Sequence, residues 1–137
     1  MNEVARYYTA SEDVAEFLAH YPERHDFREE AGGNRVFINV WCWEPAWKIR
    51  VTENGRELPV RREQTEDPLY VISYDIPQSV WKGKYPVDYG KRGKQHTLFT
   101  VDASGPATTL EIEVTDSFGK VYRETMVRPK AFGPQMK

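Results

Sequence analysis

Three histidines are the first residues whose chemistry could hold a metal ion: His20, His25 and His96. None of them belongs to an H-x-H, H-E-x-x-H or D-x-H pattern. His20 falls at the end of a predicted helix and His25 in the loop that follows, and nothing nearby completes a tetrahedral ligand set. We therefore expect no metal and no other cofactor in this chain.

The candidates for covalent or acid–base catalysis are as few. Cys42 is the single cysteine, and it falls on the apolar face of a predicted strand, where cysteine is usually an inert small hydrophobe. Glu111 and Glu113 alternate with apolar residues, which is typical of the solvated face of a strand rather than of a catalytic carboxylate pair. The chain has no G-x-S-x-G elbow and no glycine-rich phosphate loop. We expect no catalytic residue and no phosphoester hydrolysis by this chain alone.

Aromatic residues are the stronger candidates for binding. Trp41, Trp43 and Trp47 cluster around the end of one predicted strand, and Trp81 and Tyr85 lie in a later loop. A tryptophan at the rim of a β-sandwich can stack on a sugar ring or anchor a protein partner, whereas one inside the sandwich fills the core. All three interpretations stay open. We take these five residues as a candidate interface or ligand surface, and predict that at least one of Trp43, Trp47 and Trp81 is substantially exposed.

The charge distribution argues against a nucleic-acid partner. A basic loop carries Lys82, Lys84, Lys91, Arg92 and Lys94 among aromatic residues, a combination found in proteins that bind single strands. The whole chain of 137 residues, however, has 19 basic and 21 acidic side chains and a net charge of −2. A nucleic-acid-binding domain is expected to show a strong basic stripe. We therefore predict no nucleic acid.

The first part of the chain predicts one helix. Thr9 and Glu12 have the spacing of a capping box, and apolar residues then recur on one helical face up to Tyr21. Pro22 ends the helix. The charged stretch that follows finishes in Gly32-Gly33-Asn34 and predicts a loop, so we place a soft boundary at residue 34.

From residue 35 the hydrophobic pattern changes to a period of two. The segment 35–43 is apolar on both faces and is predicted to be covered on both. Asn54-Gly55 predicts a type I′ hairpin between strands 46–53 and 57–63, with Pro59 indicating an edge. Residues 69–74 form a possible short strand and 77–93 a long loop. Strands 95–102, 107–116 and 120–129 follow, with a turn from Asp116 to Gly119 between the last two.

These elements predict an all-β protein, an antiparallel β-sandwich with a short N-terminal helical segment. The turns recur at the spacing typical of sandwiches, and no segment long enough for a helix is predicted between the strands. No apolar run approaches the roughly 20 residues that span a bilayer. The first residues lack the charged, apolar and small-residue pattern of a leader, so no signal peptide is predicted from them.

Two long segments carry a combination of motifs: FINVWCWEPAWKIRVTENG and HTLFTVDASGPATTLEIEVTDSFGKVYRETMVRPKAF. They contain an Asn-Val-Trp strand, a Trp-Lys strand that ends in Glu-Asn-Gly, a His-x-Leu strand and a Thr-Asp-x-Phe-Gly-x-x-Tyr segment. Together they resemble the C-terminal domain of calcineurin-like metallophosphoesterases from Bacteroides-type bacteria. The resemblance covers residues 35–132, with 1–34 as linker and helical lead-in and 133–137 as a tail.

The resemblance implies an immunoglobulin-like β-sandwich attached to a phosphoesterase. In that family the upstream catalytic domain builds a dinuclear metal site from Asp-x-His, Gly-Asp and Asn-His motifs, and none of these occurs here. The resemblance therefore implies a non-catalytic accessory domain whose partner is the catalytic domain, with divalent metals expected only there. A glycan-binding module and a free-standing structural domain are the alternatives. Family members are usually exported, which implies a secreted or periplasmic location.

Overall fold

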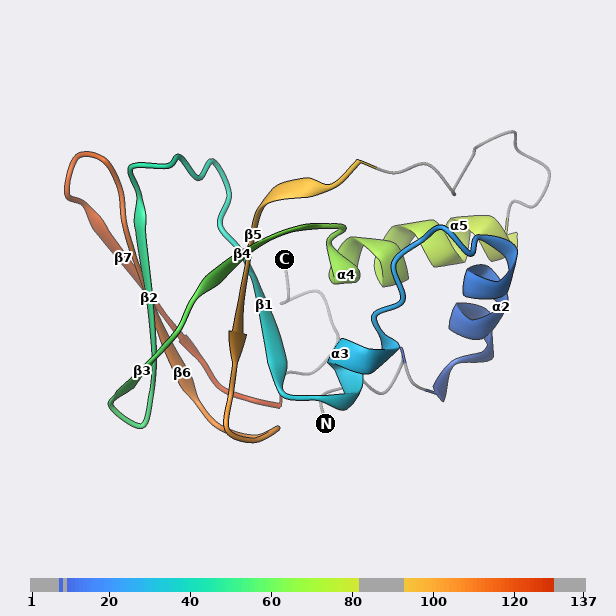
Figure 1. The fold of residues 1–137 in the computed structure, drawn as a ribbon, viewed down its shortest axis with the longest axis horizontal. Helices are drawn as coiled ribbons and strands as arrows, with labels where there is room; N and C mark the ends of the chain where they lie inside the picture. The colour runs from blue at the N-terminus through green and yellow to red at the C-terminus, as the bar shows by residue number, and fades with distance from the viewer. Residues whose placement is uncertain (1–7, 9, 82–92, 130–137) are drawn as a thin grey trace.

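The structure, a computed structural model, describes residues 8, 10–81 and 93–129, and it has three layers (Figure 1). A four-stranded sheet packs on a three-stranded sheet, and helices cover the other face of the three-stranded sheet. The predicted all-β antiparallel sandwich is confirmed. The strands are β1 (Arg35–Asn39), β2 (Lys48–Glu53), β3 (Arg56–Leu58), β4 (Arg61–Thr65), β5 (Gln95–Asp102), β6 (Leu110–Thr115) and β7 (Val121–Met126).

The two sheets have the strand orders β3-β2-β6-β7 and β1-β5-β4, and every neighbouring pair is antiparallel. Between them lies the first core, which contains Ile38, Val51, Val101, Leu110 and Ile112 among its buried residues. The alternation in β6 produces this arrangement, because Leu110 and Ile112 point inward while Glu111 stays on the outer face.

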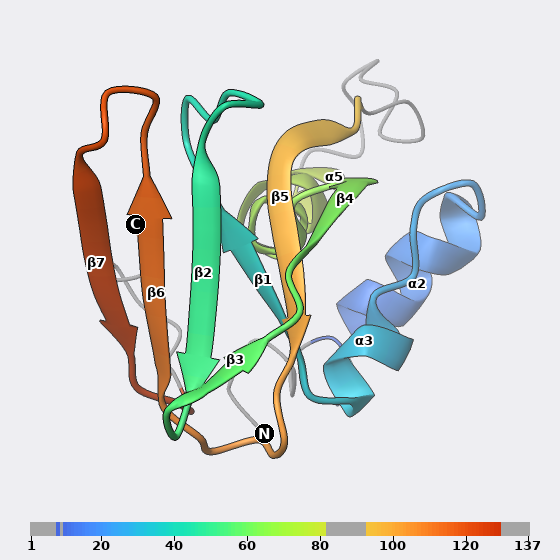
Figure 2. The same ribbon diagram turned by 60° about the vertical axis from the view of Figure 1, so that its left-hand side comes forward.

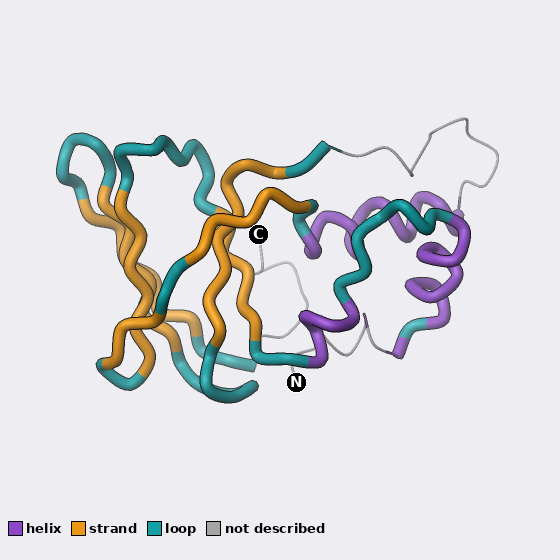
Figure 3. The backbone as a smooth tube through the Cα atoms, viewed as in Figure 1, coloured by secondary structure: helices purple, strands orange, loops and turns teal. Residues whose placement is uncertain are grey.

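The helical layer consists of α2 (Glu12–His20), α3 (Arg28–Gly32), α4 (Pro68–Tyr70), the π-helical turn η1 (Val71–Asp75) and α5 (Ile76–Trp81). It encloses the second core, formed by the buried residues Tyr8, Val14, Phe17, Phe27, Val71, Ile72 and Ile76. Residues from the first part of the chain and from the segment after β4 thus share one core. Helices α2 and α5 pack against each other on one side of the three-stranded sheet (Figure 3).

The predicted strand 69–74 is wrong, because this segment is helical. Asp67 caps the helix, its side chain accepting a hydrogen bond from the Leu69 N–H at 2.9 Å, and Pro68 occupies the first turn. Both are helix-start signals. The predicted loop 77–93 is also wrong over residues 77–81, which belong to α5, and residues 82–92 lie outside the described part of the chain.

The lead-in helix is confirmed, with a later start than predicted. It begins at Glu12 after Ser11, which makes no side-chain capping bond, and Thr9 lies outside the described residues. Val14 and Phe17 are buried on its predicted apolar face. The loop predicted for 23–34 contains the short helix α3.

The strand predicted for 35–43 ends earlier, at Asn39. Its coverage on both faces is confirmed, since Ile38 belongs to the first core while Phe37 packs against the second. The return strand predicted for 57–63 is two strands in different sheets. The chain leaves β3 at Leu58 and enters β4 at Arg61, with Pro59 at the crossing.

The β2–β3 hairpin closes through Asn54 and Gly55, whose φ angles are +51° and +76°. Glu53 pairs with Arg56, so the loop has two residues and needs positive φ at both. We expect Gly55→Val to lower the free energy of unfolding by about 1–3 kcal/mol, because a β-branched residue is strained there. Gly93→Val is the control, since Gly93 has no positive φ and open space around it. Equal losses in chemical denaturation would contradict the strained turn.

The buried carboxylate of Glu53 connects the loop between β5 and β6 to this hairpin. Glu53 accepts hydrogen bonds from the Thr108 hydroxyl at 2.5 Å and from the Ser104 N–H at 3.1 Å. These bonds hold the pKa of Glu53 below its ordinary value. The loop between β5 and β6 is therefore held by a charge-assisted contact rather than by packing alone.

Candidate functional site

The predicted chemical residues are dispersed in the structure. Within the described ranges, no three His, Cys, Asp or Glu side chains are grouped so that they could hold a metal ion. His25 Nε2 lies 2.7 Å from Glu30 Oε1, and its ring meets Phe27 edge-on at 4.5 Å. His96 is exposed on β5, and the ring of His20 contacts Tyr21.

The expectation that Cys42 lies on a buried strand face is wrong. β1 ends before it, and Cys42 is exposed with a φ of +60° in the turn that follows. Glu111 and Glu113 lie on the outer face of β6, where they contact Thr125 and Arg123 of β7. These contacts are ordinary cross-strand pairs.

The tryptophans of the β1–β2 loop have different surroundings. Trp41 is 80% exposed. Trp43 and Trp47 are partly buried and pack against the first core. Trp43 meets Phe99 edge-on at 5.2 Å, and the Arg62 guanidinium lies 4.5 Å from its ring centre. The loop therefore offers one exposed tryptophan, while the other two help to close the end of the sandwich.

The other two candidates do not join this loop. Trp81 is the last residue of α5, and the end of α5 lies at the other end of the molecule from the β1–β2 loop (Figure 1). Tyr85 lies outside the described residues. The predicted exposure of Trp43, Trp47 or Trp81 stays a prediction for Trp81, whose side chain the structure does not describe.

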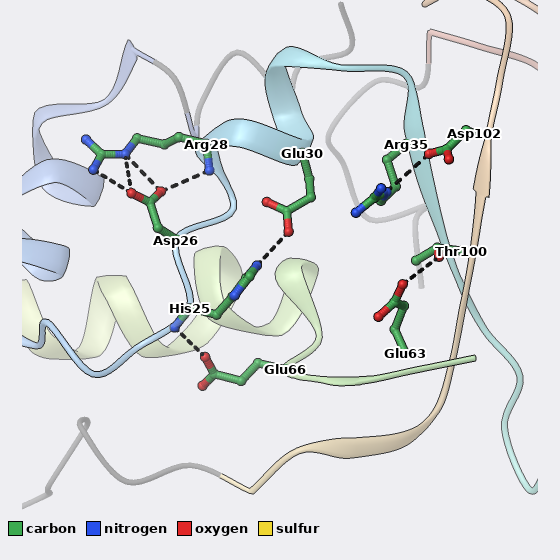
Figure 4. Close-up of polar contacts among 9 residues, drawn as sticks. All are labelled: His25, Asp26, Arg28, Glu30, Arg35, Glu63, Glu66, Thr100 and Asp102. Carbon is green, nitrogen blue, oxygen red and sulfur yellow. Dashed lines mark hydrogen bonds and ion pairs between the residues drawn. The ribbon is translucent and has the colours of Figure 1, made fainter. Parts of the chain in front are cut away.

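Sequence reasoning missed a polar groove of about 550 Å³ between the α2–α3 loop and the end of β4. A smaller cavity of about 50 Å³ shares His25, Glu63 and Thr65 with it. Figure 4 shows some of the side chains that line them. His25 lies between Glu30 and Glu66, and its backbone N–H donates to Glu66 Oε2 at 3.3 Å.

Two further carboxylates around this groove are engaged in contacts within the fold. Asp26 accepts from the Arg28 side chain at 2.6 Å, and Glu63 accepts from the Thr100 hydroxyl at 3.2 Å (Figure 4). No sequence motif signals the groove, because its walls come from segments about 40 residues apart. The groove therefore lies between the α2–α3 loop and the end of β4, with Asp26 and Glu63 paired to other side chains of the fold.

Arg24, which lines this groove, connects the loop after α2 to the segment after β4. Its Nη2 lies 2.8 Å from Asp75 Oδ2 and 2.5 Å from Glu66 Oε1. The side chains of Arg24 and Asp75 are only 3% and 1% exposed. Burial alone would lower the pKa of Arg24, but the two carboxylates raise it above its ordinary value. The guanidinium also lies 5.1 Å from the Phe17 ring centre.

Two hydrogen bonds connect the first described residue and the end of β1 to the start of α4. The buried Tyr8 hydroxyl donates to the Pro68 carbonyl at 2.6 Å. Burial, with Asp67 and Glu66 nearby, raises the pKa of Tyr8 well above its ordinary value, so it stays protonated. The Asn39 amide donates to Asp67 Oδ2 at 3.1 Å. Tyr8, the start of α4 and the end of β1 therefore meet at one place.

Further exposed aromatic residues occupy two other places. Tyr70 and Tyr74 lie on the helical layer, 47% and 46% exposed, with ring centres 5.2 Å apart. Phe118, 95% exposed, lies in the β6–β7 turn next to the half-exposed Tyr122 of β7. That turn is at the edge of the four-stranded sheet, away from the helices (Figure 2).

The folded unit thus combines a β-sandwich with a helical layer that includes the lead-in. The model of the family described as "C terminal of Calcineurin-like phosphoesterase" matches residues 1–122. The chain belongs to this family. Neither the curated proteins nor the solved structures give a match.

The family match includes the lead-in, which we expected to be a linker. The packing agrees with that extent, since Tyr8, Phe17 and Phe27 belong to the second core. The division of this C-terminal domain at residue 34 stays a prediction. Across the described part of the chain, no helix is long and apolar enough to cross a membrane.

Proposed function

We propose that this chain is a non-catalytic accessory domain that docks on the catalytic domain of the same phosphoesterase polypeptide and sets its orientation. The family description supports a catalytic partner domain. The chemistry of ester cleavage and its divalent metals then belong to that partner. The narrower resemblance to domains of Bacteroides-type bacteria, and the export that it implies, stay predictions.

The observation that carries this proposal is how the incoming chain is held. In a C-terminal domain the polypeptide arrives from the catalytic domain through the lead-in. Here Tyr8 is buried and bonded to Pro68, and Arg24 is paired with Asp75 and Glu66. A connection bound in this way transmits orientation, whereas a flexible linker would leave the two domains free to move.

Trp41 is the proposed anchor on the catalytic domain. A large, exposed aromatic side chain on a loop is the kind of residue that dominates protein interfaces. The glycan alternative uses the same exposed ring for stacking on a sugar. In the docking and the glycan proposals alike, Trp43 and Trp47 hold the loop by packing against the first core.

The test uses the full-length enzyme with Trp41→Ala. The linker in this test is the segment that joins the catalytic domain to the lead-in. If Trp41 anchors the two domains, that linker should be cleaved by a protease about tenfold faster in the variant, the change expected when an interface residue worth about 1–2 kcal/mol is lost. The melting temperature of the domain should hardly change, because Trp41 is outside both cores. Loss of retention on polysaccharide with an equally protected linker would favour the glycan function and overturn the docking role.

A further inference from the structure

Tyr70 and Tyr74 form a preorganised aromatic surface on the helical layer. Their rings are tilted by 30° with centres 5.2 Å apart, and about half of each side chain is exposed. The two residues are four apart, so they lie on the same face of the helical segment. Val71, Ile72 and Ile76 hold the opposite face in the second core.

The backbone beneath this pair is firmly held. Asp67 caps the segment, and the Ser73 hydroxyl donates to the Leu69 carbonyl at 2.6 Å. Asp75, at the end of η1, is the buried partner of Arg24. A tyrosine on a rigid support offers contact area at a low cost in side-chain entropy, and tyrosine is enriched among residues that dominate binding.

The lead-in contacts the helical segment close to this pair in sequence. The Tyr8 hydroxyl is bonded to Pro68, two residues before Tyr70. The bond from Asn39 to Asp67 brings the β1–β2 loop to the same place, so the backbones of Trp41 and Tyr70 lie within roughly 20 Å. An interface of ordinary size, about 800 Å² on each partner, is about 30 Å across and can include both.

We propose that the Tyr70–Tyr74 pair belongs to the surface on which the catalytic domain docks, together with Trp41. This inference rests on the proposed function and names the face that carries it. The catalytic domain is the proposed occupant because the lead-in, which follows it in the proposed full-length enzyme, contacts Pro68 through Tyr8. Its matching surface would offer apolar area to the two rings and hydrogen-bond acceptors to their hydroxyls. The Phe118 turn lies at the far side of the four-stranded sheet and is left out of this interface.

The experiment measures the rate of linker proteolysis in the full-length enzyme carrying Tyr70→Ala and Tyr74→Ala together. We expect cleavage at least tenfold faster than in the wild type. The matched control is Phe118→Ala with Tyr122→Ala, which also removes two exposed aromatic rings and should change the rate less than twofold. Far-UV circular dichroism checks that each variant is folded, and Tyr70→Lys and Tyr74→Lys singly replace the double variant if it is not.

The outcomes separate this inference from the proposed function. If linker proteolysis is faster in Trp41→Ala but unchanged in the double tyrosine variant, the role of the tyrosine pair is overturned and the docking role remains. Unchanged rates for both would overturn docking and this inference together. A control variant that is cleaved as fast as the tyrosine variant would also overturn the assignment of this face.

Discussion

Replacing Arg24 with alanine is expected to lower the free energy of unfolding of this chain by about 3–5 kcal/mol. The side chain is nearly inaccessible, and it compensates the charges of Asp75 and Glu66. Its removal would take the Arg24 guanidinium away from the carboxylate of Asp75, which is buried in the helical layer. Domains of this size are stable by only about 5–15 kcal/mol, so the loss is a large fraction of the total.

An exposed ion pair supplies the control for this effect. Arg61 contacts Asp102 at 3.0 Å, but both side chains are more than half exposed. Arg61→Ala should therefore cost no more than about 1 kcal/mol. Urea denaturation of both variants gives the comparison, and equal losses would show that Arg24 does not act through a buried charge.

A second variant tests the cause of the loss. An Arg24→Met variant replaces the guanidinium side chain with apolar volume, and adding Asp75→Asn then removes the carboxylate that Arg24 contacts. This double variant should be more stable than Arg24→Met alone, because a buried carboxylate that has lost the Arg24 guanidinium costs more free energy than a neutral amide. A double variant that is no more stable than the single one would contradict the electrostatic explanation.

The strands were predictable where one simple pattern decides the structure. In β6 the apolar residues Leu110 and Ile112 alternate with the polar Glu111, and this pattern predicted the strand correctly. Asn54-Gly55 supports positive φ at low cost, and the hairpin turns there. The segment around Phe37 and Ile38 is apolar on both faces because it lies between two cores.

The sequence pattern could not distinguish the helices after β4 from a strand, because the apolar run there is too short. The residues from Leu69 to Tyr74 are mostly aromatic or β-branched, which favours a strand by propensity. Tertiary packing decides instead, since Ile72 and Ile76 complete a core whose other half is contributed by the lead-in. The Asp67-Pro68 start was the one local signal that indicated a helix.

The exposure of the candidate surface residues was the least predictable part. Trp41, Trp43 and Trp47 have the same residue type within seven positions, yet only Trp41 is largely exposed. Which ring is buried depends on Phe99 and Arg62, which are distant in sequence. The buried pair of Arg24 and Asp75 spans 51 residues, and no spacing rule connects them.

Phe27 gives the sharpest test of whether the lead-in and the sandwich unfold as one unit. Its ring is buried and lies edge-on to Tyr8 at 5.5 Å and to Phe37 of β1 at 5.6 Å. It thus joins the lead-in to the face of the three-stranded sheet. Phe27→Ala should lower the free energy of unfolding by about 3–5 kcal/mol, since it removes a large side chain from the second core.

In calorimetry, the Phe27→Ala variant should show one transition, lowered by roughly 10 °C or more, because cooperative loss of this core destabilises the sheet on which it rests. Phe118→Ala removes the same side chain from an exposed turn and should shift the transition by only a degree or two. If the lead-in were merely a linker, Phe27→Ala would leave the transition of the sandwich unchanged. A second, separate transition at lower temperature would show that the helical layer unfolds independently, and the orientation of an upstream domain could not then be set through it.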